Sequence, residues 1–113
     1  LYGRAPRPYA TKRILRRLGI ARVIWLRPSY SPLADMKTLA RRLAGDGTPQ
    51  LNVLFHSSEA MVGGSPYNRT DAELEAFLDK LDAFLRFAVD ELRAAPATFC
   101  EFRSRYCAGT IGA

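Results

Sequence analysis

A long amphipathic stretch that begins at Thr70 is the strongest structural signal in this sequence. Thr70 and Glu73 have the spacing of a capping box, in which each side chain accepts a hydrogen bond from the backbone N–H of the other residue. Apolar residues then recur every three or four positions for about six turns. These are Leu74, Phe77, Leu78, Leu81, Phe84, Leu85, Ala88 and Leu92. The pattern predicts a long helix with one apolar face and a charged, solvated face opposite.

A second helix is predicted over residues 32–45. Ser31 is a candidate N-cap, and Pro32 suits the first helical position because its missing N–H would have no partner there. Gly45 and Gly47 follow the last apolar position, where a left-handed helix stop is expected. The start and the end of this helix are therefore both marked in the sequence.

Two short apolar runs predict strands. Residues 21–26 are rich in β-branched and aromatic side chains, and Pro28 stops the run. Residues 51–56 are apolar apart from Asn52 and are short enough to favour a strand over a helix. Strands that are apolar on both faces are typical of parallel sheets covered by helices, so the runs predict such a sheet.

Shorter elements complete an alternating order. A helix is predicted over residues 11–18, a very short strand over residues 96–99, and a last helix after the capping-box pair Thr98 and Glu101. Helices and strands thus alternate along the whole chain. This order is typical of α/β architecture with parallel strands and right-handed crossovers, and we expect an α/β fold.

Size and charge limit the classes of function. With 113 residues, 48% of them hydrophobic, the chain is expected to form one small domain with a core. Its net charge of +6 belongs to one end, because residues 1–34 contain eight basic residues and no acidic one. A basic end attracts anionic partners, but no nucleic-acid motif accompanies it, and no apolar run is long enough to span a membrane. Nucleic acid is therefore an unlikely partner, and we expect no membrane partner.

The two cysteines predict a reducing compartment. Cys100 and Cys107 would lie about 10 Å apart along a shared helix, which is beyond disulfide reach. No histidine pair accompanies them, as a zinc site of this kind would require. We expect free thiols and a cytoplasmic location.

His56 is the only histidine of the chain, and it ends the second apolar run. In parallel α/β folds, functional groups gather where strands end. Ser57, Ser58 and Glu59 supply polar groups beside it, and residues 57–69 form a long connection for a compact unit. A histidine in this place fits a functional role, and it equally fits an ordinary hydrogen-bonding role in the fold. From the residues alone both interpretations stay open.

A resemblance favours the functional interpretation. The stretch LNVLFHSSEAMVGGSPYNRTDAELEAFLDKLDAFLRF, residues 51–87, resembles the last conserved portion of polysaccharide deacetylase-like proteins. In those proteins a strand ending in a histidine is followed by a serine, a loop with glycine and proline, a PY-R-T segment and a long amphipathic helix. The flanking stretches LRPSYSPLADMKTLARRL and PATFCEFRSRY are similar to the neighbouring segments of that family, so the resemblance covers residues 20–106.

The resemblance implies a distorted (β/α) barrel that removes N-acetyl groups from a glycan with the help of a divalent metal. In such enzymes one aspartate is the base, a second aspartate and two histidines hold the metal, and a late histidine protonates the departing amine. Only the late histidine has a counterpart here, His56, and an imidazole that titrates near neutral pH suits proton donation. The resemblance implies that Ser57, Ser58, Tyr67 and Asn68 line the substrate site.

The chain departs from that family in what it lacks. The aspartate pair and a second histidine are absent, so the ligands of a metal-activated water are not supplied. We expect no metal or other cofactor on this chain, a divalent metal only in a complete family member, and no activity of the chain alone. A barrel needs upward of about 200 residues. Residues 20–106 are thus expected to be its C-terminal part, after a basic coil and short helix (1–19) and before a tail (107–113). The Leu1 start agrees with a piece of a longer protein.

Three functions remain open at this point. The first is a fragment of a metal-dependent polysaccharide deacetylase-like protein, and the second is a small non-enzymatic α/β interaction module whose basic end docks an acidic partner. The third is a degenerate deacetylase that binds sugar without hydrolysing it. In the first case part of a barrel would leave sheet edges unpaired, so self-association is also expected.

Overall fold

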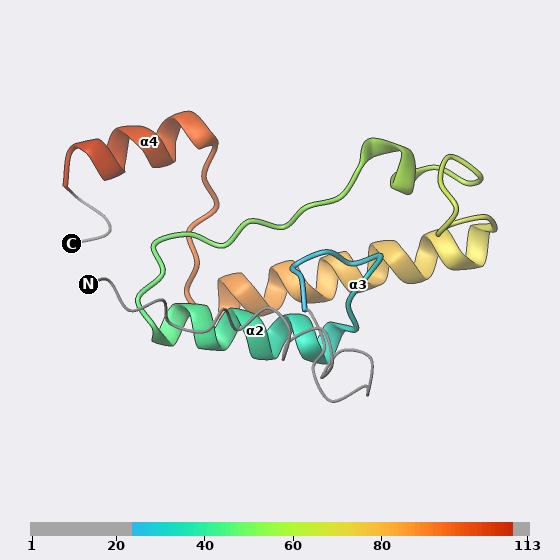
Figure 1. Cartoon of the computed structure of the whole chain (residues 1–113), viewed down its shortest axis with the longest axis horizontal. Helices are drawn as coiled ribbons and strands as arrows, with labels where there is room; N and C mark the ends of the chain where they lie inside the picture. Colours follow the sequence, from blue (N-terminus) through green and yellow to red (C-terminus); the bar gives the residue numbers. More distant parts are fainter. Residues whose placement is uncertain (1–23, 110–113) are drawn as a thin grey trace, which may run out of the picture.

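The computed structural model describes residues 24–109, and the regular structure in that range is helical. In chain order the elements are α2 (Leu33–Gly45), the short 3-10 helix η1 (Ser57–Ala60), α3 (Asp71–Asp90) and α4 (Phe99–Cys107). Figure 1 shows α2 and α3 side by side, with the chain between α2 and η1 running past them as an extended trace and α4 set apart. The helix predicted over residues 11–18 lies outside the described residues.

The predicted α/β fold is wrong for the described part of the chain. Neither 24–26 nor 51–56 forms a strand, no strand occurs at 96–99, and residues 21–23 lie outside the description. Two of these runs do approach each other, because the backbone N–H of Leu54 donates to the carbonyl of Leu26 at 3.0 Å. A strand needs a repeated ladder of such bonds along a neighbour, and one bond does not make a ladder. The barrel expected from the resemblance is therefore also wrong for the described residues, because a barrel is built from paired strands.

The long helix is confirmed, including its start. The Thr70 side chain accepts a hydrogen bond from the Glu73 N–H at 3.2 Å, and a Glu73 carboxylate oxygen accepts one from the Thr70 N–H at 3.1 Å. The last helix begins with the same reciprocal pair at Thr98 and Glu101. Both capping boxes satisfy N–H groups that have no partner inside the helix.

The α2 helix begins one residue later than predicted. Pro32 is the N-cap, and Ser31 instead uses its hydroxyl oxygen to accept a hydrogen bond from the Trp25 N–H at 3.0 Å. The predicted left-handed stop is confirmed at Gly47, whose φ is +76°. A residue with a side chain is strained at that angle, so glycine belongs there.

A small core holds α2 and α3 together. Its fully or almost fully buried side chains are Leu26, Met36, Ala40, Phe84 and Phe87. Leu78 and Leu85, which belong to the predicted apolar face of α3, remain 45% and 47% exposed. The apolar stripe of α3 is thus wider than the surface that covers it.

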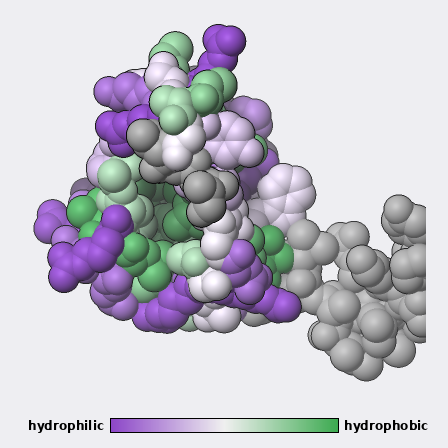
Figure 2. All heavy atoms as spheres, turned by 90° about the vertical axis from the view of Figure 1, so that its left-hand side faces the viewer, coloured by the Kyte–Doolittle hydropathy of each residue, from purple (hydrophilic) through white to green (hydrophobic). Residues whose placement is uncertain are grey.

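The α4 helix adds nothing to this core, because none of its residues is buried. It carries Cys100 and Cys107, which are free, as predicted, and which are also exposed. Figure 2 looks at the end of the molecule where α4 lies and shows apolar side chains open to view in a hollow there. Among the helices of residues 24–109, none has the length and apolar character needed to cross a membrane.

Candidate functional site

A buried ion pair joins two distant parts of the chain. Nη2 of Arg27 lies 2.5 Å from Oε1 of Glu59, and the two side chains are 12% and 1% exposed. The Nε atom of Arg27 is buried without a hydrogen-bond partner among the described residues. Buried charges are tolerated when they are paired and hydrogen-bonded, so Glu59 is what compensates the guanidinium.

Glu59 also organises the loop around it. Its carboxylate accepts hydrogen bonds from the Ser29 hydroxyl and, at 3.3 Å, from the backbone N–H of His56. Its backbone carbonyl accepts a hydrogen bond from the Asn68 side-chain amide at 2.5 Å. One residue therefore connects the start of the 57–69 loop, the end of that loop and the segment that contains Arg27.

A glycine lets the loop close on itself. A Cβ atom placed on Gly64 would lie 2.5 Å from the backbone oxygen of Ser58, which is closer than real contacts allow. Its neighbour Gly63 has a φ of +71° and donates its N–H to the Asn68 carbonyl at 2.8 Å. The loop is thus a compact turn built on its own backbone.

The pKa of Glu59 reflects this network. Burial by itself raises the pKa of the carboxyl, but hydrogen bonds from Ser29, Arg27 and the His56 N–H outweigh burial and hold the pKa below its ordinary value of 4.5. The carboxylate therefore contributes stability fully above pH 4.5, and this contribution is lost as the pH falls through the lowered folded-state pKa.

This linkage predicts a pH effect on the melting temperature. We expect Glu59→Gln to lower the melting temperature at neutral pH, and we expect the gap from the wild type to shrink as the pH falls below 4.5. Thermal melts followed by circular dichroism from pH 7 to about pH 3 measure it. Glu75→Gln, which removes an exposed carboxyl from the solvated face of α3, is the control. A gap that is constant across the range would contradict the assignment to Glu59.

The Tyr30 and Tyr67 rings lie over the Arg27 guanidinium, and Trp25 stacks on Tyr30. We call these three exposed rings the aromatic shelf. The Arg27 guanidinium lies 4.4 Å from the centre of the Tyr30 ring, and the Tyr67 hydroxyl donates to the Tyr30 hydroxyl at 2.7 Å. The Trp25 and Tyr30 rings are stacked, 6.5 Å apart with an angle of 28°. Their exposed fractions are 52% for Trp25, 59% for Tyr30 and 37% for Tyr67. The shelf is open to solvent and rests on a buried base.

The Tyr67 hydroxyl stays protonated at neutral pH. Its hydrogen bond to Tyr30 is the main cause of a raised pKa, and burial adds to the rise. The Tyr67 ring is therefore neutral, and its hydroxyl group can both donate and accept hydrogen bonds.

The long helix fixes the turn that carries Tyr30. Lys80 of α3 donates from Nζ to the Pro28 carbonyl at 2.8 Å. Beside the turn, residues 24–27 line an open pocket of about 410 Å³ together with Leu39, Asn52 and Leu54. Trp25 belongs to both the pocket and the shelf.

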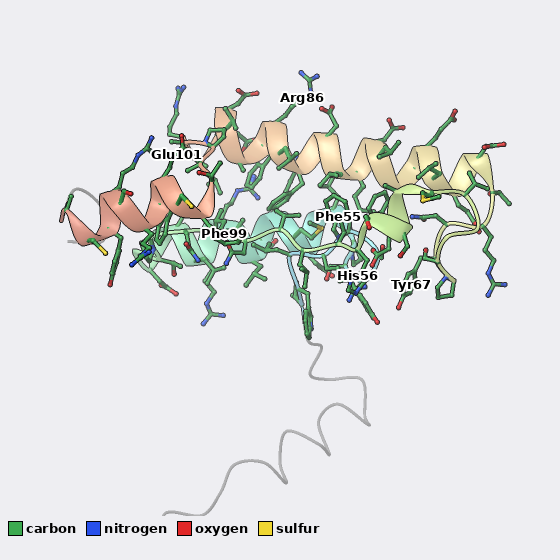
Figure 3. The ribbon with its side chains drawn as sticks, turned by 90° about the horizontal axis from the view of Figure 1, so that it is seen from above. Phe55, His56, Tyr67, Arg86, Phe99 and Glu101 are labelled. Atoms are coloured by element: carbon green, nitrogen blue, oxygen red, sulfur yellow. The ribbon has the colours of Figure 1, made fainter. Side chains whose placement is uncertain are left out.

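The structure brings the five predicted site residues to one end of the 24–109 region. His56 and Ser57 are exposed at the start of η1, Ser58 is half-buried and Tyr67 belongs to the shelf. Figure 3 shows His56 and Tyr67 on the same side of the ribbon, away from Phe99 and Glu101 of α4. Asn68 is buried, and its amide is engaged with Glu59. Substrate contact by these residues stays a prediction.

The residues near His56 do not fit the divalent metal that the resemblance implies. Within residues 24–109, no three side chains of His, Cys, Asp or Glu lie close enough together to hold a metal ion. Glu59 is the nearest acidic group in sequence, and both of its carboxylate oxygens are engaged by Arg27 and Ser29. No metal-assisted step is derived for this chain.

Comparisons with protein-family models, with curated proteins and with solved structures found no match for this chain. The resemblance to polysaccharide deacetylase-like proteins therefore stays a prediction from the sequence. What the chain does has to be inferred from the geometry of the shelf and of the loop below it.

Sequence reasoning missed most of this geometry. The sequence places Trp25 in a predicted strand and Arg27 among the basic residues of the first part of the chain. It suggests no role for Tyr30, and it marks Glu59 only as a polar neighbour of His56. One signal was present. An arginine that directly follows an apolar run and precedes a proline is a candidate for a buried charge, which then requires an acidic partner.

Proposed function

We propose that this protein binds a glycan chain on the aromatic shelf without hydrolysing it. The observation that carries the proposal is the exposure of the Trp25, Tyr30 and Tyr67 rings on a base held by the Arg27–Glu59 ion pair. Large aromatic side chains that stay about half exposed in one contiguous patch are typical of a binding surface.

The chemistry of the shelf suits a sugar. A pyranose ring has an apolar face of C–H groups and a rim of hydroxyl groups, so it needs flat apolar surfaces next to hydrogen-bonding groups. Trp and Tyr provide both, with little conformational entropy to lose on binding. The Tyr30 and Tyr67 hydroxyl groups and the exposed side chains of His56 and Ser57 supply donors and acceptors at the edge.

The shelf and the loop beside it do not supply the groups that hydrolysis requires. His56 is the only histidine in the chain, and the oxygens of Glu59 are engaged in the ion-pair network, so a base and a metal ligand set are not available beside it. A proton-donating role for His56 in a longer deacetylase stays a prediction from the resemblance. Binding is the role for which the described residues suffice.

Trp25 makes the proposal directly testable because it is the only tryptophan of the chain. We expect a tetramer of β-1,4-linked N-acetylglucosamine to shift or quench the tryptophan fluorescence in a saturable way. Trp25→Ala should weaken binding of the same tetramer by about tenfold, measured by titration calorimetry.

Phe99→Ala is the matched control, because Phe99 is an aromatic ring that is 77% exposed on α4, away from the shelf. It should bind as the wild type does. An unchanged fluorescence spectrum at millimolar tetramer, or equal weakening by both variants, would contradict glycan binding at the shelf.

A further inference from the structure

The extended segment 51–56 has one occupied edge and one free edge. The Leu54 N–H donates to the Leu26 carbonyl, so that edge faces residues 24–27. In an extended chain, backbone groups of successive residues point to opposite edges. The N–H and C=O groups of Leu51, Val53 and Phe55 therefore point away from residues 24–27. Within residues 24–109, these groups form no backbone hydrogen bond.

The side chains of the segment follow the same alternation. Leu51 and Val53 pack against the core, and the Phe55 ring meets the Phe77 ring of α3 edge-on at 5.7 Å. Leu54 is 51% exposed on the other face. One face is thus held by the helices, which keeps the segment extended. Figure 1 shows no described element along the edge away from residues 24–27.

We propose that a second copy of this chain pairs with the free edge through its own segment 51–56, in antiparallel orientation. With Val53 opposite Val53 of the second copy, Leu51 stands opposite Phe55 and Phe55 opposite Leu51. Each of these is a hydrogen-bonded pair of the antiparallel pattern, in which two residues exchange both of their bonds. All the unpaired backbone groups of the free edge then have partners.

The segment suits its own copy for three reasons. Residues 51–55 carry no charge, so two copies do not repel each other when they align. They contain no proline, and their apolar, β-branched and aromatic side chains favour pairing. The edge also lacks the charges, prolines and bulges that keep exposed edges from pairing. A twofold axis through Val53 closes the contact, so pairing stops at a dimer.

The pairing is tested by removing one N–H. Val53→Pro removes the central donor of the free edge, and Val53→Ala removes the same side-chain packing while it keeps the donor. We measure the mass of the full chain by sedimentation from about 1 µM to about 1 mM, because a contact of this size is weak. The wild type and Val53→Ala should approach dimer mass, and Val53→Pro should stay a monomer at every concentration.

Hydrogen exchange of the wild type gives a second measurement that does not depend on any variant. The amides of Leu51, Val53 and Phe55 should exchange more slowly at high concentration than at low concentration. A wild-type chain that stays monomeric, a dimer with unprotected amides at these residues, or a Val53→Pro chain that still dimerises would each overturn the proposal. Because the pairing does not use the aromatic shelf, glycan binding stands or falls separately.

Discussion

Glu59→Ala is expected to lower the free energy of unfolding by about 3–5 kcal/mol. The change leaves the Arg27 guanidinium, only 12% exposed, without its counter-charge. It also removes the acceptor of the Ser29 hydroxyl and of the His56 N–H. Whole domains are stable by only about 5–15 kcal/mol, so the loss is a large part of the total. Urea unfolding followed by Trp25 fluorescence measures it.

Glu91→Ala is the matched control. It breaks a second Arg–Glu ion pair, Arg41–Glu91 at 3.1 Å, whose side chains are more than half exposed. Exposed pairs contribute about 0–1 kcal/mol, so this variant should be close to the wild type. The double variant Arg27→Met with Glu59→Leu should be less destabilised than Glu59→Ala alone, because no uncompensated charge remains. Equal losses for Glu59→Ala and Glu91→Ala would show that the buried pair is not special.

The helices could be predicted because their signals are local. A capping box such as Thr70 with Glu73 involves residues three apart, and apolar periodicity repeats within one element. Even so, the exact start of α2 was missed, because Ser31 uses its hydroxyl oxygen on the distant Trp25 N–H rather than on its own helix. A side chain with two available partners cannot be assigned from its neighbours in sequence.

The strands failed for a physical reason. An apolar run such as 51–56 shows that a segment is buried or half-buried and extended, but a strand also requires a neighbour in register. The chain supplies one backbone bond between Leu54 and Leu26 and no ladder. The sequence pattern thus correctly indicates an extended conformation, but the pairing with neighbouring strands that we predicted from it is wrong. The same lack of a ladder leaves one edge of segment 51–56 free.

The candidate site was found only in part. His56 and the long loop after it were predicted because a lone histidine at a junction is visible in the sequence. The Arg27–Glu59 pair joins residues 32 positions apart, and the shelf depends on it. The sequence around Arg27 does not indicate that Glu59 is its partner, and the sequence around Glu59 does not indicate Arg27. Long-range pairing of charges is decided by the packing that buries them, which periodicity does not describe.

Phe84→Ala tests whether the contact between α2 and α3 is what holds the described region together. Phe84 is 1% exposed and lies in the core with Met36 and Ala40 of α2. Truncating a buried phenylalanine costs about 3–5 kcal/mol, because transfer free energy is lost and a cavity remains. The expected result is a large drop in the urea midpoint.

Leu85→Ala separates packing from helix propensity. Leu85 is the next residue of α3, and it is 47% exposed. Both variants put alanine, the best helix former, into the same turn, so the helix itself is not weakened by either change. Leu85→Ala should cost less than about 1 kcal/mol. If both variants were equally destabilised, the exposed stripe of α3 would have to be covered in solution. If neither were, the α2–α3 contact would not limit stability, and the base of the shelf would have to be held by the Arg27–Glu59 network alone.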